Sequence, residues 1–359
     1  MKILILTPYA IDGLKNSGDD LIVKSLINLI KDYSEKEIIF DIVSIAKSTI
    51  DKVEKFMRTD LKQYDKILMP AFRISLEHQE NLNIRIKYLE KAIRLNIPVF
   101  ALGCSWCIYP GTIEQTKNKM NVYEKALLKY LLNDKNSCVT ARDILTSQFL
   151  KYNGLDVPVY GDLALFSYRT IKKPLDCYKI EKIAISLPHN INHYKEVDKL
   201  KDILQKEGFK VIITTHQTLP EERLYKKYVN LSGDSSNLDY YKNIDMHVGF
   251  RLHAHKWFLK NRKPSFLIAE DGRGWGHLLT FEGLGMHAVS NYIRKEASKI
   301  KGDPLLLTEL GQKSNINIDF LINAIKKEIN GEFKTTKEIL NKIDLLFNEY
   351  VKIIGKIVE

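Results

Sequence analysis

The clearest indication of the fold lies in residues 245–277, which read DMHVGFRLHAHKWFLKNRKPSFLIAEDGRGWGH. Two apolar runs, 245–250 and 264–270, are typical of strands buried on both faces of a parallel sheet, and a strand-to-helix junction follows the first. Four of the nine histidines fall in this stretch, together with Arg251 and three closely spaced glycines. If the chain has a reaction centre, we expect it here.

Arg251 and His253 are separated by one residue, and Gly249 just before them allows close approach of a ligand or backbone. In an extended chain the two side chains project to the same side, whereas in a helix Arg251 faces His255 instead. Either geometry can place one arginine beside one histidine, which suits an anionic substrate undergoing acid–base chemistry. The alternative is that these histidines are packing residues, and we expect this of His247 and His255.

The segment GRGWGH (272–277) matches neither a GxGxxG nor a Walker motif. As a glycine-rich loop before a helix, its backbone amides could hold a phosphate. A plain surface loop is the alternative. We include Gly272, Arg273, Gly274 and His277 among the candidate substrate-binding residues.

Strand and helix signals alternate along the rest of the chain. Further strands are predicted at 2–7, 38–45, 66–72, 98–104, 137–141, 182–188 and 210–216. Helices are predicted at 19–31, 84–95, 122–132, 194–207, near 221–228, and over a long amphipathic tail at 336–358. This βαβ alternation predicts an α/β fold with two Rossmann-like domains whose parallel sheets face a central cleft, the organisation of GT-B-type enzymes.

The composition change around 167–180 suggests a linker between the two domains. We therefore expect an N-terminal domain at 1–170, a C-terminal domain at 180–334, and a C-terminal helix at 335–359 that packs back across the junction. Ligands of such sheets bind beyond the carboxyl ends of the strands. Three candidate features fall at those ends in the first domain: NSGD, the GCSWC turn and Arg142.

Asn16, Gly18 and Asp19 lie in NSGD, between the first strand and its helix. They form either a helix cap or part of a site, because Gly18 lets the backbone come close to a ligand. Arg142 follows the strand at 137–141, and its guanidinium fork matches a carboxylate or phosphate. The alternative is an ion pair with Asp143, which would cap the next helix.

The net charge of +11 comes from lysines and arginines spread along the chain, so we do not expect nucleic acid as a partner. A basic surface also suits phosphorylated substrates or an anionic membrane. No apolar run approaches the roughly 20 residues that cross a bilayer, and the N-terminus reads as a buried strand, so we expect a cytoplasmic protein. Cys104 and Cys107 form a CxxC without a second ligand pair, which favours structural cysteines over a metal site or redox chemistry.

Four motifs in order carry a family resemblance: NSGD (16–19), TARDILTSQFL (140–150), GDLAL (161–165) and GFRLHAHKWFLKNRKPSFLIAEDG (249–272). Together they resemble the polysaccharide pyruvyl transferase family over roughly residues 5 to 290. The resemblance implies a GT-B-like fold and transfer of a pyruvyl group from phosphoenolpyruvate to a sugar, usually as a cyclic ketal, in the synthesis of a cell-envelope polysaccharide or its lipid-linked precursor.

The family's motifs fall on single positions of this chain: Asn16, Gly18 and Asp19; Arg142; Gly161 and Asp162; Arg251, Leu252 and His253. After the strand at 264–270 the chain departs from the family pattern, because EDGRGWGH stands where a tyrosine or aspartate with a lysine is common. We expect the second domain to bind the donor and the first to bind the acceptor.

From these matches we assign His253 as the general acid, with Arg251 and Arg142 holding the donor's carboxylate and phosphate. Asp19 or Asp162 would orient or deprotonate the sugar. This chemistry requires no metal and no cofactor. Three alternatives stay open: a nucleotide-sugar glycosyltransferase, a non-catalytic glycan- or phosphate-binding protein, and a redox protein using Cys104 and Cys107.

Overall fold

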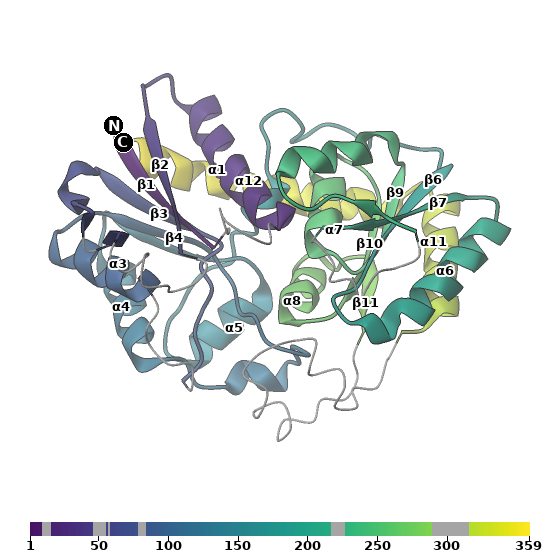
Figure 1. The fold of residues 1–359 in the computed structure, drawn as a ribbon, viewed down its shortest axis with the longest axis horizontal. Helices are drawn as coiled ribbons and strands as arrows, with labels where there is room; N and C mark the ends of the chain where they lie inside the picture. The colour runs from purple at the N-terminus through teal and green to yellow at the C-terminus, as the bar shows by residue number, and fades with distance from the viewer. Residues whose placement is uncertain (9–15, 46–54, 57, 78–83, 217–226, 289–315) are drawn as a thin grey trace. The chain divides into compact units, whose positions relative to one another are not determined.

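The chain forms two compact units in the computed structural model, which describes residues 1–8, 16–45, 55–56, 58–77, 84–216, 227–288 and 316–359. Unit 1 comprises Met1–Trp106, Ile113–Arg169 and Leu345–Glu359, and unit 2 comprises Cys107–Thr112 and Thr170–Asp344. Each unit is built on its own parallel sheet (Figure 1).

The sheet of unit 1 has the strand order β2-β1-β3-β4-β5. Its strands are β1 Lys2–Thr7, β2 Ile39–Ser44, β3 Lys66–Pro70, β4 Val99–Cys104 and β5 Cys138–Ala141. β4 is buried along its whole length, and β1 is buried from Ile3 onward. This burial is expected for strands covered by helices on both faces. The topological switch point of this sheet lies between β1 and β3, because the chain first adds β2 on one side of β1 and then β3 on the other.

The helices of unit 1 lie on both faces of this sheet. They are α1 Ser17–Tyr33, α3 Ile84–Arg94, α4 Val122–Asn133 and α5 Ile144–Tyr152. Figure 1 shows α1 on one side of the sheet and α3 with α4 on the other. This arrangement follows from right-handed crossovers that run in opposite directions from the centre of the sheet.

The sheet of unit 2 has the order β11-β10-β9-β6-β7-β8, and all of its described pairings are parallel. Its strands are β6 Lys182–Ser186, β7 Lys210–Thr215, β8 Val229–Asn230, β9 Met246–Gly249, β10 Ser265–Ala269 and β11 Gly285–His287. The chain runs outward from β6 to β8 and then returns to place β9 beside β6. The topological switch point of this sheet therefore lies between β6 and β9.

Gly249 makes the contact between β9 and β6 possible. Its φ is +155°, and a Cβ there would lie 2.6 Å from the Ser186 backbone nitrogen. A larger residue would collide with the neighbouring strand, since the obstacle is backbone and cannot rotate away. The close approach allowed for at this glycine is thus made by a backbone.

Helices again cover both faces of the unit 2 sheet. They are α6 Tyr194–Lys206, α7 Leu252–Lys260, α8 Gly272–Phe281 and α11 Ile318–Asn330. Figure 1 shows α7 and α8 on one side of the sheet and α6 with α11 on the other. None of the described helices is long and apolar enough to cross a membrane.

The long C-terminal helix α12 (Lys334–Val358) contributes residues to both units. Within unit 2, Asp344 forms an ion pair with Arg262. Within unit 1, Tyr350 packs against Phe166, with ring centroids 5.2 Å apart. Each half of the helix is therefore anchored in its own unit, and its packing across the junction stays a prediction.

The segment Cys107–Thr112 belongs to unit 2, although it follows β4 of unit 1 in the chain. The Gly272 backbone N–H donates to the Ile108 carbonyl at 2.9 Å, and His287 Nε2 lies 2.8 Å from the Pro110 carbonyl oxygen. The predicted N-terminal domain at 1–170 included this segment. Backbone hydrogen bonds that periodicity cannot reveal place it in the other unit.

Several elements differ from expectation. α11 and the short strands β8 and β11 were not predicted, and part of the predicted helix near 221–228 lies outside the described residues. The segment 272–277 is not a loop, because α8 begins at Gly272. The long central strands lie within two residues of their predicted bounds.

Candidate functional site

Arg251 and His189 lie at the switch point of the unit 2 sheet. Arg251 follows β9 and His189 follows β6, which pair side by side. Arg251 Nη1 lies 2.9 Å from His189 Nδ1 and 2.8 Å from His189 Nε2. Ligands of open α/β sheets bind beyond the carboxyl ends of the strands at this position, so the pair stands where a substrate is expected.

The backbone around Arg251 explains its orientation. Arg251 is the N-cap of α7, with φ −84° and ψ 109°, and its backbone N–H donates to Ser186 Oγ at 2.9 Å. The helix begins at Leu252, so the helical alternative applies from there onward. The guanidinium contacts the His189 ring, whereas the His255 ring bonds to Ser265.

His253 lies in the first turn of α7 and is half-buried. Burial is the main cause of the lowered pKa of His216, but the charges of Arg251 and His253 contribute to it. His253 contributes in the same way to the lowered pKa of His189. Arg251 at the N-cap of α7 and His253 in its first turn thus act on the same two histidines, His189 and His216.

Glu270 comes from β10, the strand on the other side of β9. Its two carboxylate oxygens accept the backbone N–H groups of His189 at 2.8 Å and Asn190 at 3.0 Å. Burial raises the pKa of Glu270 to about 7, although the two backbone hydrogen bonds and Arg251 act in the opposite direction. Three adjacent strands, β6, β9 and β10, therefore each supply one polar side chain.

Two histidines near Arg251, His189 and His216, are neutral at physiological pH. Burial lowers the pKa of His189 and of His216 well below the usual value, and the Arg251 charge lowers both further. His216 Nε2 lies 2.8 Å from the Tyr241 hydroxyl, which in turn lies 2.7 Å from Thr214 Oγ1. The guanidinium is therefore set among uncharged rings, where its positive charge is little screened.

His247 and His255 are completely buried and bonded through serines. His247 bridges Ser186 and Ser265 at 2.8 Å each, and His255 Nδ1 lies 2.7 Å from Ser265 Oγ. Burial lowers the pKa of His247 to about 3, so the ring is neutral. Both rings occupy the packing positions expected of them.

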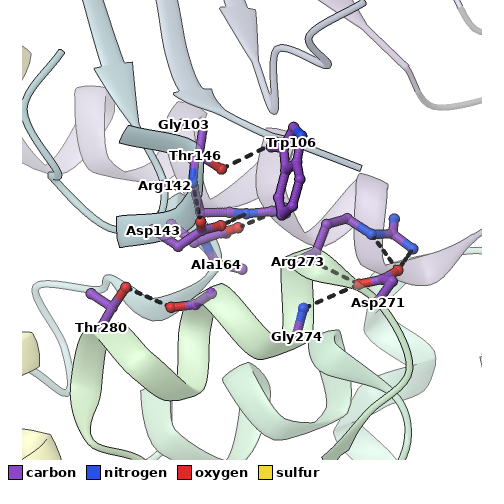
Figure 2. Close-up of polar contacts among 12 residues, drawn as sticks. Gly103, Trp106, Arg142, Asp143, Thr146, Ala164, Asp271, Arg273, Gly274 and Thr280 are labelled. Atoms are coloured by element: carbon purple, nitrogen blue, oxygen red, sulfur yellow. Dashed lines mark hydrogen bonds and ion pairs between the residues drawn. The ribbon is translucent and has the colours of Figure 1, made fainter. Parts of the chain in front are cut away.

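Asp271 shapes the start of α8, as Figure 2 shows. Its carboxylate accepts the backbone N–H groups of Arg273 at 2.9 Å and Gly274 at 3.1 Å, and the Arg273 guanidinium at 2.8 Å. Burial would raise the pKa of Asp271, but Arg273 and these hydrogen bonds outweigh burial and lower it. The carboxylate is therefore ionised and tightly held.

The backbone amides that were predicted to hold a phosphate already have partners. The Gly272 N–H already donates to Ile108, and the next two amides donate to Asp271. A phosphate would have to displace the aspartate to reach them. His277 is buried, with its ring 5.0 Å from that of His255. Substrate binding by Gly272, Arg273, Gly274 and His277 stays a prediction.

Arg142 in unit 1 stands among carboxylates. It follows β5, and its guanidinium lies 3.4 Å from Asp143 and 3.4 Å from Asp162, all three side chains being buried (Figure 2). Asp143 caps α5 by accepting the Thr146 N–H at 2.8 Å. The ion pair and cap considered as the alternative are present, and a substrate-binding role for Arg142 stays a prediction.

Asp162 has a second bond, since it accepts the Ala164 N–H at 2.9 Å as the cap of the 3₁₀ helix Leu163–Leu165. That short helix packs against α1. At the start of α1, Asn16 accepts the Gly18 N–H at 3.0 Å, and Asp19 lies in the first turn. NSGD is thus a helix cap, and the packing of α1 on the short helix brings two of the predicted motifs onto touching elements.

Cys104 lies in surroundings that do not favour its thiolate. Burial raises the pKa of the Cys104 thiol, the opposite of what a reactive thiolate needs. Within the described ranges, no group of three or more His, Cys, Asp or Glu side chains is arranged to hold a metal ion.

His189 and Glu270 were missed as site residues. His189 directly follows the predicted strand at 182–188, and Glu270 is the last residue of the predicted strand at 264–270, so their place at carboxyl ends was readable from the sequence. Their proximity to Arg251 was not, because β6 and β9 lie far apart in the chain and pair only in the folded sheet.

Comparison with known proteins bears on both fold and family. UGT89C1 of Arabidopsis thaliana, solved with quercetin, is 9% identical, with 98% of this chain and 99% of that chain covered and a TM-score of 0.51. UDP-GlcNAc 2-epimerases of Neisseria meningitidis (10% identity, 98% and 100% covered, TM-score 0.48) and Methanocaldococcus jannaschii (12% identity, 97% and 99% covered, TM-score 0.47) are also similar. The likeness to the first, with two parallel sheets in one chain, confirms a GT-B-like α/β fold.

No curated protein sequence matches the chain significantly. The sequence profile of the family described as polysaccharide pyruvyl transferase matches residues 16–272, more than half of the chain. This range contains Arg142, Arg251, His253 and the newly found His189 and Glu270. The chain therefore belongs to the polysaccharide pyruvyl transferase family.

Proposed function

We propose that this protein transfers a pyruvyl group from phosphoenolpyruvate to a sugar of a cell-envelope polysaccharide or its lipid-linked precursor, forming a cyclic ketal and releasing phosphate. The observation that carries this proposal is the placement of Arg251 at the switch point of unit 2, against the neutral ring of His189. Family membership supports the reaction class.

Unit 2 suits an anionic donor. Arg251 offers a planar fork that matches a carboxylate or phosphate, and the N-terminus of α7 beside it adds a partial positive charge. The His189 ring against the guanidinium is neutral and Asp271 is bonded to Arg273, whereas Glu270 also acts on Arg251 from the end of the neighbouring strand. We expect Arg251 to bind the donor's carboxylate or phosphate.

His253 is suited to act as the general acid, because it is half-buried in the first turn of α7, next to Arg251. It would donate its proton to the methylene carbon of the donor, which becomes a methyl group and leaves C2 electron-poor. A sugar hydroxyl then bonds to C2 and gives up its proton. Phosphate leaves C2 with the electron pair of the broken C–O bond, and a second hydroxyl then bonds to C2 and gives up its proton, which closes the ketal.

Unit 1 suits the acceptor. Arg142 lies among two carboxylates, and Asp19 adds a third on α1, which packs beside the element capped by Asp162. Carboxylates accept hydrogen bonds from sugar hydroxyls and can take their protons. We assign Asp162 or Asp19 to orient or deprotonate the acceptor, and the contacts of Arg142 lead us to propose that it fixes these carboxylates instead of holding the donor.

A cytoplasmic enzyme working at an anionic membrane surface would fit the net charge of +11. Such a surface is where a lipid-linked acceptor would be presented. The enzyme would need neither a metal nor a cofactor, because proton transfer and anion binding are sufficient for the chemistry.

The test is a screen of lipid-linked and nucleotide-linked sugars with phosphoenolpyruvate, read as phosphate release and as the product's mass. A mass gain equal to a pyruvate ketal is expected for one acceptor class. Thermal stabilisation by UDP- or GDP-sugars but not by phosphoenolpyruvate would instead indicate a glycosyltransferase. Binding of either ligand without turnover under all conditions would indicate a binding protein.

A further inference from the structure

Glu270 bridges two strand ends of the unit 2 sheet, and although it falls within the motif at 249–272, no role was assigned to it from the sequence. It directly follows β10, and both of its carboxylate oxygens accept backbone N–H groups of the turn after β6. β9, which Arg251 follows, lies between those two strands. The carboxylate thus spans the strand that bears the proposed donor-binding arginine.

The two hydrogen bonds fix a specific piece of backbone. The amides of His189 and Asn190 are consecutive, and they converge on one carboxylate at 2.8 and 3.0 Å. A carboxylate that accepts two backbone N–H groups strongly restrains the turn carrying them. The His189 side chain is therefore held at a set position over the end of β6.

His189 in turn contacts the Arg251 guanidinium through Nη1. Arginine side chains have several rotatable bonds, so a guanidinium is oriented only where neighbours restrain it. The backbone of Arg251 is restrained separately, by the bond from its N–H to Ser186. The side chain's restraint by His189 depends on the turn that Glu270 holds.

We propose that Glu270 is a positioning residue, which fixes the His189–Asn190 turn and, through the His189 ring, orients Arg251 for the anionic donor. This inference rests on the proposed function for the identity of the donor. Glu270 itself touches backbone amides and has no assigned contact with the reacting atoms. Its effect should appear in donor affinity more than in the rate of chemistry.

The first arm of the test needs no ligand. Hydrogen exchange at the His189 and Asn190 amides is compared between the wild type and Glu270→Gln. The amide side chain keeps one acceptor oxygen and loses the other, so exchange at one of the two positions is expected to become about tenfold faster or more. Unchanged protection at both positions would overturn the inference.

The second arm measures affinity for phosphoenolpyruvate by calorimetry, with Glu328→Gln as the matched control. Glu328 is also a buried carboxylate of unit 2 that accepts a backbone amide, that of Thr336 at 2.6 Å. Glu270→Gln is expected to weaken donor binding about tenfold or more, with a smaller change in kcat. Glu328→Gln is expected to alter thermal stability without altering donor affinity. Equal donor affinity in wild type and Glu270→Gln would overturn the inference.

A double-mutant cycle isolates the link through His189. If Glu270 acts through that ring, the Glu270→Gln and His189→Ala double variant should bind the donor about as weakly as the weaker single variant. If the losses of donor affinity in the two single variants multiply in the double variant, the link through His189 is contradicted. Should Glu270→Gln fail to fold, Glu270→Asp retains the charge one methylene shorter, and intermediate exchange and affinity are expected; wild-type values for both would overturn the inference.

The two proposals fail in distinguishable ways. If the wild type neither binds nor consumes phosphoenolpyruvate, the proposed function is wrong, and the exchange arm still decides whether Glu270 holds the turn. If the wild type uses phosphoenolpyruvate and Glu270→Gln binds it equally well, the function stands and the positioning role is wrong.

Discussion

Arginines follow parallel strands in both units, but their surroundings differ. Arg142 follows the edge strand β5 and lies beside two carboxylates that cap helices, whereas Arg251 follows β9 at the switch point and lies against a neutral imidazole. Unit 1 thereby places two carboxylates beside its arginine, whereas in unit 2 the ring against the arginine is neutral and the nearby Glu270 carboxylate accepts two backbone amides. The same residue type thus suits an acceptor's hydroxyls in one unit and an anionic donor in the other.

The difference comes from the partners' second bonds. Asp143 and Asp162 each cap a helix and also approach Arg142, so the guanidinium completes a structural network. Both carboxylate oxygens of Glu270 instead accept backbone N–H groups of the turn after β6. An arginine's role therefore depends on what its neighbouring carboxylates are already bonded to.

The largest effect is expected from His253→Ala. Loss of a positioned proton donor should slow turnover by roughly 100- to 10,000-fold, whereas thermal stability should change little because the side chain is half-buried. Phosphate release with phosphoenolpyruvate and acceptor measures the first, and a melting curve the second. Release at a near wild-type rate would contradict the assignment.

Acidification should destabilise unit 2 more than unit 1. Burial lowers the pKa of His193 to about 4 and of His247 to about 3, from 6.5. The stability each contributes is present above about pH 6.5 and is lost as the pH falls, on the order of 2 kcal/mol for each at pH 5. The single histidine in the sequence of unit 1, His78, lies outside the described residues. Hydrogen exchange, corrected for its intrinsic pH dependence, should show unit 2 opening first.

Glu270 sharpens the acid experiment because its pKa shifts the other way. Raised by burial from 4.5 to about 7, it favours the folded state most at low pH and loses that contribution as the pH rises through about 7. Arg251, Asp271 and the backbone amides of the His189 turn also act on it. Glu270→Gln should therefore make the acid loss of unit 2 steeper, and equal acid sensitivity of the two units would contradict the prediction.

Matched glycines at the two strand ends should respond unequally. A Cβ on Gly249 would lie 2.6 Å from the backbone of Ser186, whereas a Cβ on Gly103, at φ +57°, has its nearest neighbour at 3.9 Å. Gly249→Ala should cost about 4 kcal/mol through backbone strain and overpacking, and Gly103→Ala about 1 to 2 kcal/mol through its left-handed backbone alone. Urea unfolding measures both, and equal losses would refute the close approach of β9 and β6.

The smallest effect tests the arginines directly. Arg251→Lys keeps the charge but loses the planar fork, so the KM for phosphoenolpyruvate should rise about tenfold, with the acceptor KM unchanged. Arg142→Lys should act on the acceptor KM or on kcat. Initial-rate kinetics with each substrate varied in turn distinguishes the two. A rise in donor KM for both variants would mean that the units share donor binding.

Periodicity predicted the central strands well because they are continuous apolar runs with buried ends. β1 matches its predicted bounds, 2–7, and β6 begins at the predicted residue, 182. β8 has two residues and β11 begins at a glycine, so neither has a strand signal of its own. Such strands exist because a neighbouring strand offers hydrogen bonds.

α8 shows why the glycine-rich segment was mistaken for a loop. Three glycines disfavour a helix by intrinsic propensity. In the folded unit, a Cβ on Gly274 would lie 2.9 Å from the Ala269 Cβ, so a small residue is required where this helix meets β10. Tertiary packing outweighs propensity, and the capping carboxylate of Asp271 secures the first turn.

The sequence alone determined the α/β class, the family motifs, and the residues Arg142, Arg251 and His253, because each is written in a local pattern of apolar runs and neighbouring side chains. Only the tertiary structure decided that His189 and Glu270 join Arg251. The physical reason is the return of the chain at the switch point, where strands about sixty residues apart in the sequence pair side by side and bring their carboxyl ends together.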